Sequence, residues 1–144
     1  MQIVQGNENN LDEVLVIFEQ ARGLMTYLPQ LHTHEETKNF ILELLKSGST
    51  FIAQEEAIMG FVTIENGWVE HLYVSPQFQD HGVGKKLLDK AKELSPGGLK
   101  LWVFEENSGA IKFYEREGFR LIKKRNKEEQ DNEEGQPDRL YQLG

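Results

Sequence analysis

The stretch "QDHGVGKK", residues 79–86, decides how the chain on either side of it folds. It follows the strand-like run "WVEHLYV" (68–74) and opens a segment whose apolar residues recur at helical spacing. "SPGG" (95–98) ends that helix, and the next run, "LKLWVF" (99–104), is again typical of a strand. Strand, glycine loop, helix and strand make a βαβ unit, so we expect the two strands to lie parallel with the helix on one face of a sheet.

The chain before this unit predicts an antiparallel meander preceded by two helices. Strand-like runs cover residues 50–54, 57–65 and 68–74, and the dipeptide "NG" (66–67) between the last two is a strong signal for a two-residue hairpin. A short first strand is expected at 2–4.

Two capping patterns mark the helices that come between the first strand and the meander. Asn10 and Glu13 have the spacing of a capping box, and Thr33 and Glu36 form a second one. Pro29 separates the two helices.

After the βαβ unit, the chain predicts one more helix and two closing strands. The helix lies within 107–117 and is ended by Gly118. The strands are "RLIKKR" (120–125) and "DRLYQL" (138–143), joined by the polar, charged loop 126–137. We expect the last strand to form an edge through which a homodimer could assemble.

The composition fits a single domain spanning residues 1–144, since 38% of the residues are hydrophobic and there is no sign of a repeat. Cysteine is absent, which excludes disulfides and thiolate zinc sites and favours a cytoplasmic location. A net charge of −8 disfavours nucleic acid and anionic membranes. The one basic cluster, "KKR" (123–125), is followed at once by acidic residues, so we expect no nucleic-acid partner. The first ten residues, "MQIVQGNENN", lack the basic start and apolar core typical of a signal peptide, and no apolar run approaches the roughly 20 residues that cross a bilayer, so we expect a soluble protein.

The glycine loop predicts an anion cradle, because a helix start preceded by glycines presents free backbone N–H groups and a positive dipole end. It matches neither of the two commonest phosphate motifs. A P-loop needs serine or threonine after its lysine, but Lys86 and Leu87 follow Lys85, and a dinucleotide fingerprint needs a third glycine where Leu87 stands. Nucleotide hydrolysis and NAD binding are therefore not expected.

What remains is a Q-x-x-G-x-G pattern made by Gln79, Gly82 and Gly84, after a strand ending in "LYVSP". One strand later, "ENSGAIKFYEREGF" (106–119) has the form N-x-x-A-x-x-F-Y-x-x-x-G-F. In order, spacing and element context, the two motifs resemble those of the GCN5-related N-acetyltransferases, the GNAT superfamily. The resemblance covers about the whole chain, most securely residues 58–121.

The resemblance implies a mixed α/β fold with a central, mostly antiparallel, twisted sheet of about seven strands, one parallel splayed pair and about four helices. It also implies that acetyl-CoA lies between the splayed strands as a cosubstrate, with its pyrophosphate on the glycine loop, and that no metal is needed. By the family's motifs, the residues expected to bind it are Leu72, Tyr73, Val74, Gln79, Asp80, His81, Gly82, Val83, Gly84, Lys85, Asn107, Ala110, Phe113 and Tyr114.

The reaction implied is direct attack of a primary amine on the thioester. A backbone N–H of the strand ending "LYV" would stabilise the developing oxyanion. Tyr114 is the candidate acid for the departing thiolate, since a phenol with an ordinary pKa of about 10 is fairly well matched to a thiol near 8.5. Glu70 is the candidate base for the acceptor amine, with His71 or a water chain as the alternatives. If side chains alternate along 68–74, Glu70 shares a face with Trp68, Leu72 and Val74, whereas His71 points the other way with Val69 and Tyr73. Only one of Glu70 and His71 can then face the cavity.

The acceptor end carries less information. The loop between the first two helices roofs the acceptor site in the family, which makes Tyr27 and His32 the candidate substrate contacts. His32 and His34 have metal-pair spacing, but nothing completes a site. The acceptor is expected to be an amine of a small molecule or peptide, and the net charge favours a cationic one. The competing reading is a CoA sensor or partner-binding module with little transfer activity, which would have no chemical need of Tyr114 or Glu70.

Overall fold

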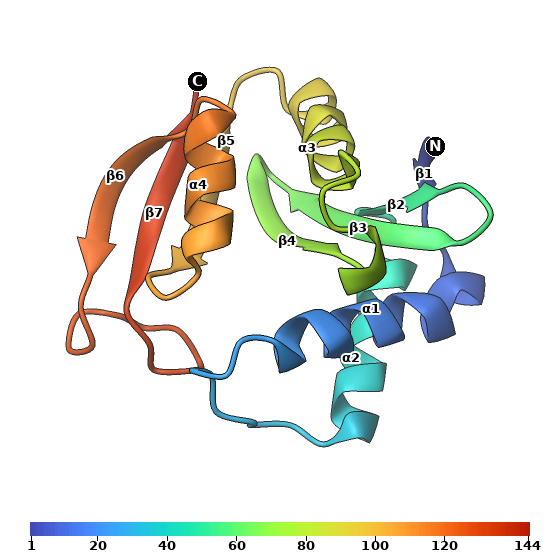
Figure 1. The fold of residues 1–144 in the computed structure, drawn as a ribbon, viewed down its shortest axis with the longest axis horizontal. Coiled ribbons are helices and arrows are strands. Elements are labelled where there is room, and N and C mark those ends of the chain that lie inside the picture. The colour runs from blue at the N-terminus through green and yellow to red at the C-terminus, as the bar shows by residue number, and fades with distance from the viewer.

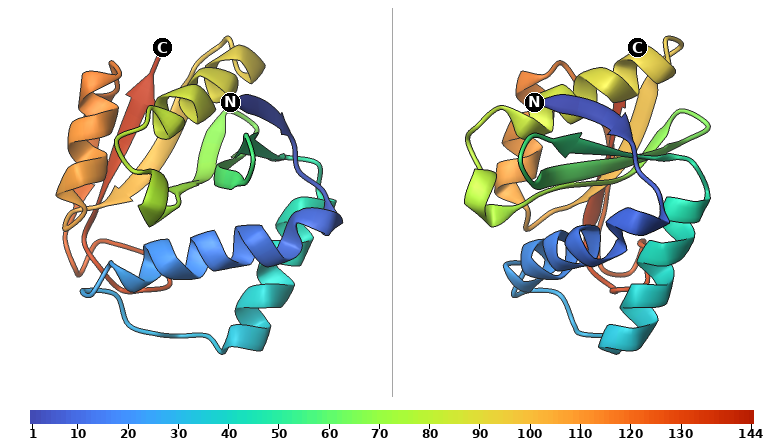
Figure 2. Two further views of the ribbon diagram at one scale, coloured as in Figure 1. Left: turned by 45° about the vertical axis from the view of Figure 1, so that its right-hand side comes forward. Right: turned by 90° about the vertical axis from the view of Figure 1, so that its right-hand side faces the viewer.

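The computed structural model describes all 144 residues. Four α-helices and two short 3-10 helices lie around one sheet (Figures 1 and 2). The strands are β1 (Gln2–Gln5), β2 (Thr50–Gln54), β3 (Ile58–Glu65), β4 (Trp68–Val74), β5 (Leu99–Phe104), β6 (Arg120–Arg125) and β7 (Asp138–Leu143). The helices are η1 (Glu8–Asn10), α1 (Leu11–Gly23), α2 (His34–Lys46), η2 (Pro76–Phe78), α3 (Val83–Leu94) and α4 (Ser108–Arg116).

The seven strands follow the order β1-β2-β3-β4-β5-β7-β6. Every neighbouring pair is antiparallel except β4 and β5, which are parallel. This confirms the mixed fold expected from the sequence, with four α-helices and one parallel pair. The predicted hairpin between β3 and β4 is also confirmed, because Asn66 and Gly67 both adopt positive φ, 52° and 82°, as a two-residue turn of this kind requires.

β4 and β5 share only one bridging position, Trp68 opposite Lys100, so the two strands separate toward their carboxyl ends. The separation divides the sheet into one half made of β1 to β4 and another made of β5, β7 and β6 (Figure 1). The expected splayed pair is therefore present, and it leaves the β5-facing edge of β4 without a partner strand beyond Trp68.

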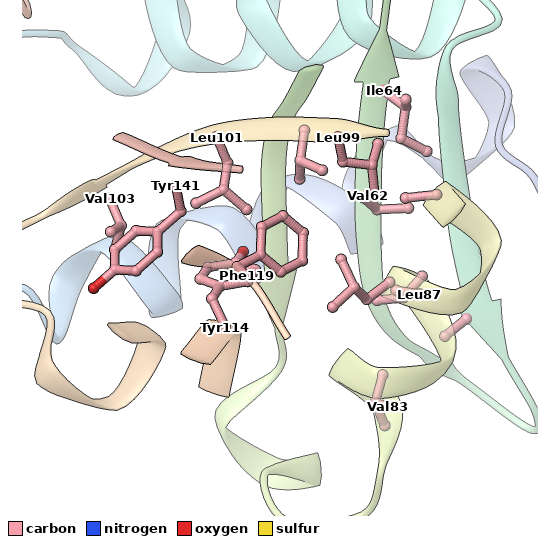
Figure 3. Close-up of a cluster of buried hydrophobic side chains, with 14 of the residues drawn as sticks. Val62, Ile64, Val83, Leu87, Leu99, Leu101, Val103, Tyr114, Phe119 and Tyr141 are labelled. Atoms are coloured by element: carbon pink, nitrogen blue, oxygen red, sulfur yellow. The ribbon is translucent and has the colours of Figure 1, made fainter. Parts of the chain in front are cut away.

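Each face of the β1–β4 half is covered by helices, and neighbouring residues of β3 show how the two faces differ. Phe61 packs in a cluster with α1 and α2, whereas Val62 packs in the larger cluster with α3 and α4. All of β3 except Glu65 is buried, as expected for a central strand covered on both sides. On the other half, α4 covers one face, where Tyr114, Phe119 and Tyr141 pack together (Figure 3).

Three expectations differ from the structure: the capping box before α1, the place of the last strand in the sheet, and the alternation of side chains along β4. The capping box before α1 is formed by Asn7 and Asn10 around η1, not by Asn10 and Glu13, because η1 inserts an extra turn ahead of the helix. The strand at 138–143 is not an edge: β7 lies between β5 and β6, and β6 forms the edge. The box of Thr33 and Glu36 at α2 is confirmed.

The third difference concerns the alternation of side chains along β4. Thr63 pairs with His71 and Ile64 with Val69, so Glu70 is an extra residue in a β-bulge. The bulge resets the alternation: Val69 and Leu72 both pack on the α3 side, while His71 faces α1 and α2. The expected grouping of Val69 with His71 is wrong for this reason.

Candidate active site

A cleft of about 680 Å³ opens where β4 and β5 separate. Its lining comes from the end of β4, the loop 78–82, the start of α3, the segment 106–117 around α4, and the end of α1 with the loop behind it. Residues from both sequence motifs therefore meet around one cavity.

The glycine loop forms one end of the cleft. Asp80 and Gly82 both have positive φ, 65° and 76°, and these two residues bend the chain into α3. The first backbone bond of the helix runs from Lys86 N–H to the Gly82 carbonyl, and the N–H groups of Val83, Gly84 and Lys85 donate to no acceptor in the protein. Three free donors at the positive end of a helix dipole make a site for anionic oxygens.

The Lys85 ammonium is less available to pair with an anion in the cleft than the sequence implies. Its ammonium lies 3.5 Å from both Asp89 and Glu117, and these carboxylates, Asp89 first, raise the pKa of Lys85. The lysine is exposed and already has anionic partners. The backbone N–H groups of Val83, Gly84 and Lys85, which have no protein acceptor, are therefore the donors at this end that remain free for an anion.

The two motifs contact each other at Gly84. A Cβ at this position would lie 3.5 Å from the Phe113 ring, an ordinary van der Waals distance. The absence of a side chain at Gly84 therefore keeps the space between α3 and α4 open. Asn107 caps α4 by accepting a 3.2 Å hydrogen bond from the Ala110 N–H. The N-x-x-A part of the second motif is thus a helix cap that fixes where α4 begins.

Tyr114 lies on the cleft wall and is 7% exposed. Its ring packs against Phe113 and Phe119, with centroids 5.1 and 5.4 Å away. Burial, and next the nearby Tyr73, raise the pKa of Tyr114 well above its ordinary value. The phenol is therefore protonated at neutral pH, and because Tyr114 lines the cleft its hydroxyl can donate to a group bound there.

The opposite end of the cleft is formed by Tyr27 and Tyr73. The Tyr73 hydroxyl accepts a 3.4 Å hydrogen bond from Arg22. The Tyr27 hydroxyl is buried and has no partner, while its ring packs edge-on against Phe104. Burial, then Tyr73 and Glu106, raise the pKa of Tyr27, and Arg22 opposes them. A buried hydroxyl without a partner at a cleft wall is a ready contact for a polar ligand group.

Two acidic side chains of the loop 126–137 pair with residues of α1 and of the α1–α2 loop, although neither lines the cleft. Glu134 lies 3.7 Å from the Arg22 guanidinium, and Glu133 pairs with His32. These contacts join the β6–β7 loop to α1 and to the α1–α2 loop, which meet at the bottom left of Figure 1. Sequence reasoning missed Arg22, Glu133 and Glu134, because only the fold brings residues about a hundred positions apart together.

Most of the residues named from the sequence line the cleft. They are Tyr27, Leu72, Tyr73, Val74, Gln79, Asp80, Gly82, Val83, Gly84, Lys85, Asn107, Ala110, Phe113 and Tyr114. His81, His32 and Glu70 do not line it. Glu70 is exposed in the bulge of β4, and partial burial, followed by the neighbouring Glu65, raises its pKa.

His71 also lies outside the cleft, in an aromatic cluster with Phe18, Phe40 and Tyr73. Burial, and then the positive charge of Arg22, lower the pKa of His71 to about 4. The imidazole is therefore neutral near pH 7. No group of three or more histidine, aspartate or glutamate side chains is arranged to hold a metal ion.

Residues 46–121 match the acetyltransferase (GNAT) domain family. The chain belongs to the GNAT acetyltransferases. The match runs from the end of α2 through the glycine loop to the start of β6, and so it contains β4, β5, both motifs and most of the cleft lining.

Relatives of this GNAT domain agree with the assignment. An uncharacterized N-acetyltransferase of Archaeoglobus fulgidus is 29% identical over 140 residues, which cover 83% of this chain and 93% of that one. The peptidyl-lysine N-acetyltransferase YjaB of Salmonella typhimurium is 29% identical over 89 residues, 60% of each chain. The PaiA N-acetyltransferase of Thermoplasma acidophilum, solved with coenzyme A, has the same fold, with a TM-score of 0.71 at 17% identity over 98% of this chain and 96% of that one. No helix of the GNAT domain is long and apolar enough to cross a membrane.

Proposed function

We propose that this GNAT domain transfers the acetyl group of acetyl-CoA to a primary amine of a small molecule or peptide. The observation that carries the proposal is the cleft between β4 and β5, with three free N–H groups at one end and the Tyr114 hydroxyl on its wall. The cradle at α3 suits a pyrophosphate, and the free edge of β4 suits an extended pantetheine arm that pairs with backbone groups.

The chain's own groups then have three tasks in the transfer. A backbone N–H at the end of β4, near Leu72 and Val74, stabilises the negative charge that develops on the thioester oxygen. Tyr114 donates its proton to the sulfur as the carbon–sulfur bond breaks and the carbon–nitrogen bond forms. Its raised pKa keeps the phenol protonated in the free protein but makes it a weaker acid toward the thiolate than its ordinary pKa of about 10 implies, and the phenol is reprotonated by solvent after each turnover.

The third task is to remove a proton from the acceptor, because an amine with a pKa near 10.4 is mostly cationic at neutral pH. We assign this to Glu70. Since Glu70 does not line the cleft, it acts through water rather than by direct contact. His71, buried among aromatic rings, is the alternative base.

The acceptor end supports an amine with a polar contact close to its nitrogen. The partnerless Tyr27 hydroxyl supplies that contact. His32 does not line the cleft and is paired with Glu133, so we place it at the rim of the acceptor site. Relatives named peptidyl-lysine N-acetyltransferases support a lysine side chain of a peptide as one acceptor class to test first.

The proposal is tested with two measurements on the purified protein. Thermal melting with acetyl-CoA or CoA at about 100 times Kd should show a stabilisation of roughly 2.7 kcal/mol that ATP and NAD do not give. Thiol release with a panel of neutral, acidic and cationic amines should then identify the acceptor class. No shift with either CoA species would contradict the proposal, and a shift without thiol release from any amine would favour a CoA sensor instead.

A further inference from the structure

The β6 strand forms one free edge of the sheet, opposite the edge formed by β1, and β7 and β5 lie between it and the cleft (Figure 1). Five of its six residues are exposed, and only Arg125 is partly buried. Its inner row of backbone groups pairs with β7, and its outer row pairs with nothing in the protein. Such an edge is a template on which another extended chain can add as a strand.

The side chains of this edge are partly apolar. Leu121 and Ile122 are neighbours in sequence and are 41% and 45% exposed. The register of β6 on β7 shifts between Leu121 and Lys123, so Ile122 lies in a bulge. Bulges and charges at an edge often serve only to prevent aggregation, but two adjacent exposed aliphatic side chains work against that purpose.

The edge also carries four cations, and two of them have carboxylate partners. Arg125 pairs with Asp138 and Asp131, both 2.6 Å away, and Lys124 lies 3.9 Å from Glu105. The remaining two cations, Arg120 and Lys123, make no ion pair, although the chain holds 24 acidic residues and 16 basic ones.

The two unpaired cations lie on the same face of the sheet, opposite α4. Arg120 stands opposite Gln142, and Lys123 stands opposite Leu140 of β7, which pairs on its other side with Trp102 of β5. The Lys123 ammonium is 5.8 Å from the centre of the Trp102 ring, and Trp102 is 37% exposed. The face beside the free edge is thus aromatic and positively charged.

A second copy of the chain is a poor occupant for this edge. If two β6 strands paired about an axis through Ile122, Arg120 of one copy would lie opposite Lys124 of the other. Like charges directly opposite each other destabilise a strand pair. Nucleic acid is disfavoured as well, because Glu128, Glu129 and Asp131 lie within six residues of the end of β6. An extended segment with carboxylates meets neither obstacle.

We propose that β6 binds an extended acidic segment of a partner protein, which adds to the sheet as an eighth strand. Carboxylates at alternate positions of the segment lie opposite Arg120 and Lys123, and apolar residues between them contact Leu121. The site is separated from the cleft by β7 and β5, so its occupation does not require CoA. It goes beyond acetyl transfer and does not depend on it.

The test uses a fluorescein-labelled peptide of about eight residues that alternates glutamate with valine or threonine, and a twin with lysine in place of glutamate. Fluorescence anisotropy should show saturable binding of the acidic peptide only, weakened by salt. The double variant Arg120→Glu, Lys123→Glu should raise its Kd at least about tenfold. The matched control is Lys38→Glu, Lys46→Glu, which makes the same charge change on α2 and should leave Kd unchanged.

A second measurement on the unsubstituted protein keeps the proposal falsifiable if the double variant folds poorly. In a titration followed by amide NMR shifts, the acidic peptide should move β6 and the adjoining β7, with and without saturating CoA. The proposal is overturned if the shifts fall at the start of α3 and CoA abolishes them, because the peptide then occupies the anion cradle. Equal binding of the lysine twin, tighter binding of a single-stranded oligonucleotide, or a peptide-sensitive dimer in sedimentation would also overturn it.

Discussion

Trp68 and Lys100 form the single bridging position between β4 and β5, and the Lys100 ammonium lies 5.9 Å from the centre of the Trp68 ring. Beyond this pair the two strands part, so one row of backbone groups on β4 remains free to pair with a ligand. The cleft is therefore a consequence of where strand pairing stops, and the residues that keep it open are those that hold α3 and α4 at their present distance.

Gly84 tests that relationship. A Cβ added at Gly84 would lie at ordinary contact distance from the Phe113 ring, so Gly84→Ala should be tolerated. The two γ-methyl groups of Gly84→Val extend beyond that contact and should narrow the cleft. We expect Gly84→Val to weaken CoA binding at least about tenfold, measured from ligand-dependent melting. The matched control is Gly97→Val, at a position with no atom within 4 Å of a Cβ. Equal CoA affinity in both valine variants would contradict the prediction.

Tyr114→Phe should separate catalysis from binding. The ring packing against Phe113 and Phe119 is kept, and only the proposed acid is removed. Loss of a general acid costs about 10²- to 10⁴-fold, so kcat should fall in that range while the melting shift with CoA stays within about a degree of that of the unsubstituted protein. An unchanged kcat would rule out the acid role, and a lost melting shift would point to a binding role instead.

Tyr27→Phe should improve stability and impair acceptor binding. The buried hydroxyl has no partner, so removing it relieves an unfavourable burial worth about 1 kcal/mol, which raises Tm by a few degrees. The same change removes the proposed contact to the amine and should raise KM for the acceptor, while KM for acetyl-CoA stays the same. A fall in Tm would indicate that the hydroxyl is satisfied by bound water in the free protein.

Local signals in the sequence were enough to predict most of this fold. The asparagine–glycine hairpin, the Thr33 cap and the glycine loop before α3 each depend on a few adjacent residues, and all three are present. The bulge at Glu70 and the insertion of β7 between β5 and β6 depend on strand register and pairing order, which no local pattern specifies.

The same distinction explains the outcome at the candidate site. The two motifs named most of the cleft lining, since each forms one contiguous wall. Strict alternation implied that one of Glu70 and His71 would face the cavity, but a single extra residue in β4 breaks that alternation and neither side chain lines the cleft. The Arg22–Glu134 contact joins segments at opposite ends of the chain, so it could not be read from either.

His71 should make the protein acid-sensitive in a definite pH window. Its pKa is about 4 in the folded state, against about 6.5 when unfolded, so between these values the unfolded chain binds a proton that the folded one does not. The free energy of unfolding should therefore fall as pH drops from 6.5, by roughly 3 kcal/mol at pH 4. Denaturant titrations should show this slope, and His71→Phe, which keeps an aromatic ring in the cluster, should flatten it. A slope that persists in the variant would assign the acid sensitivity to other groups.

Glu70 and its neighbour Glu65 provide the test for the base. A general base must be unprotonated, so kcat should decline on the acid side, with a limb at the raised pKa of Glu70. Glu65→Gln removes the second cause of that raised pKa, so it should move the limb to lower pH without lowering the plateau. Glu70→Gln should lower the plateau and abolish the limb.

If the base is His71, Glu65→Gln should leave the limb near pH 4 and His71→Phe should remove it. A limb unchanged in all three variants would exclude both residues and leave solvent to accept the proton of the acceptor amine.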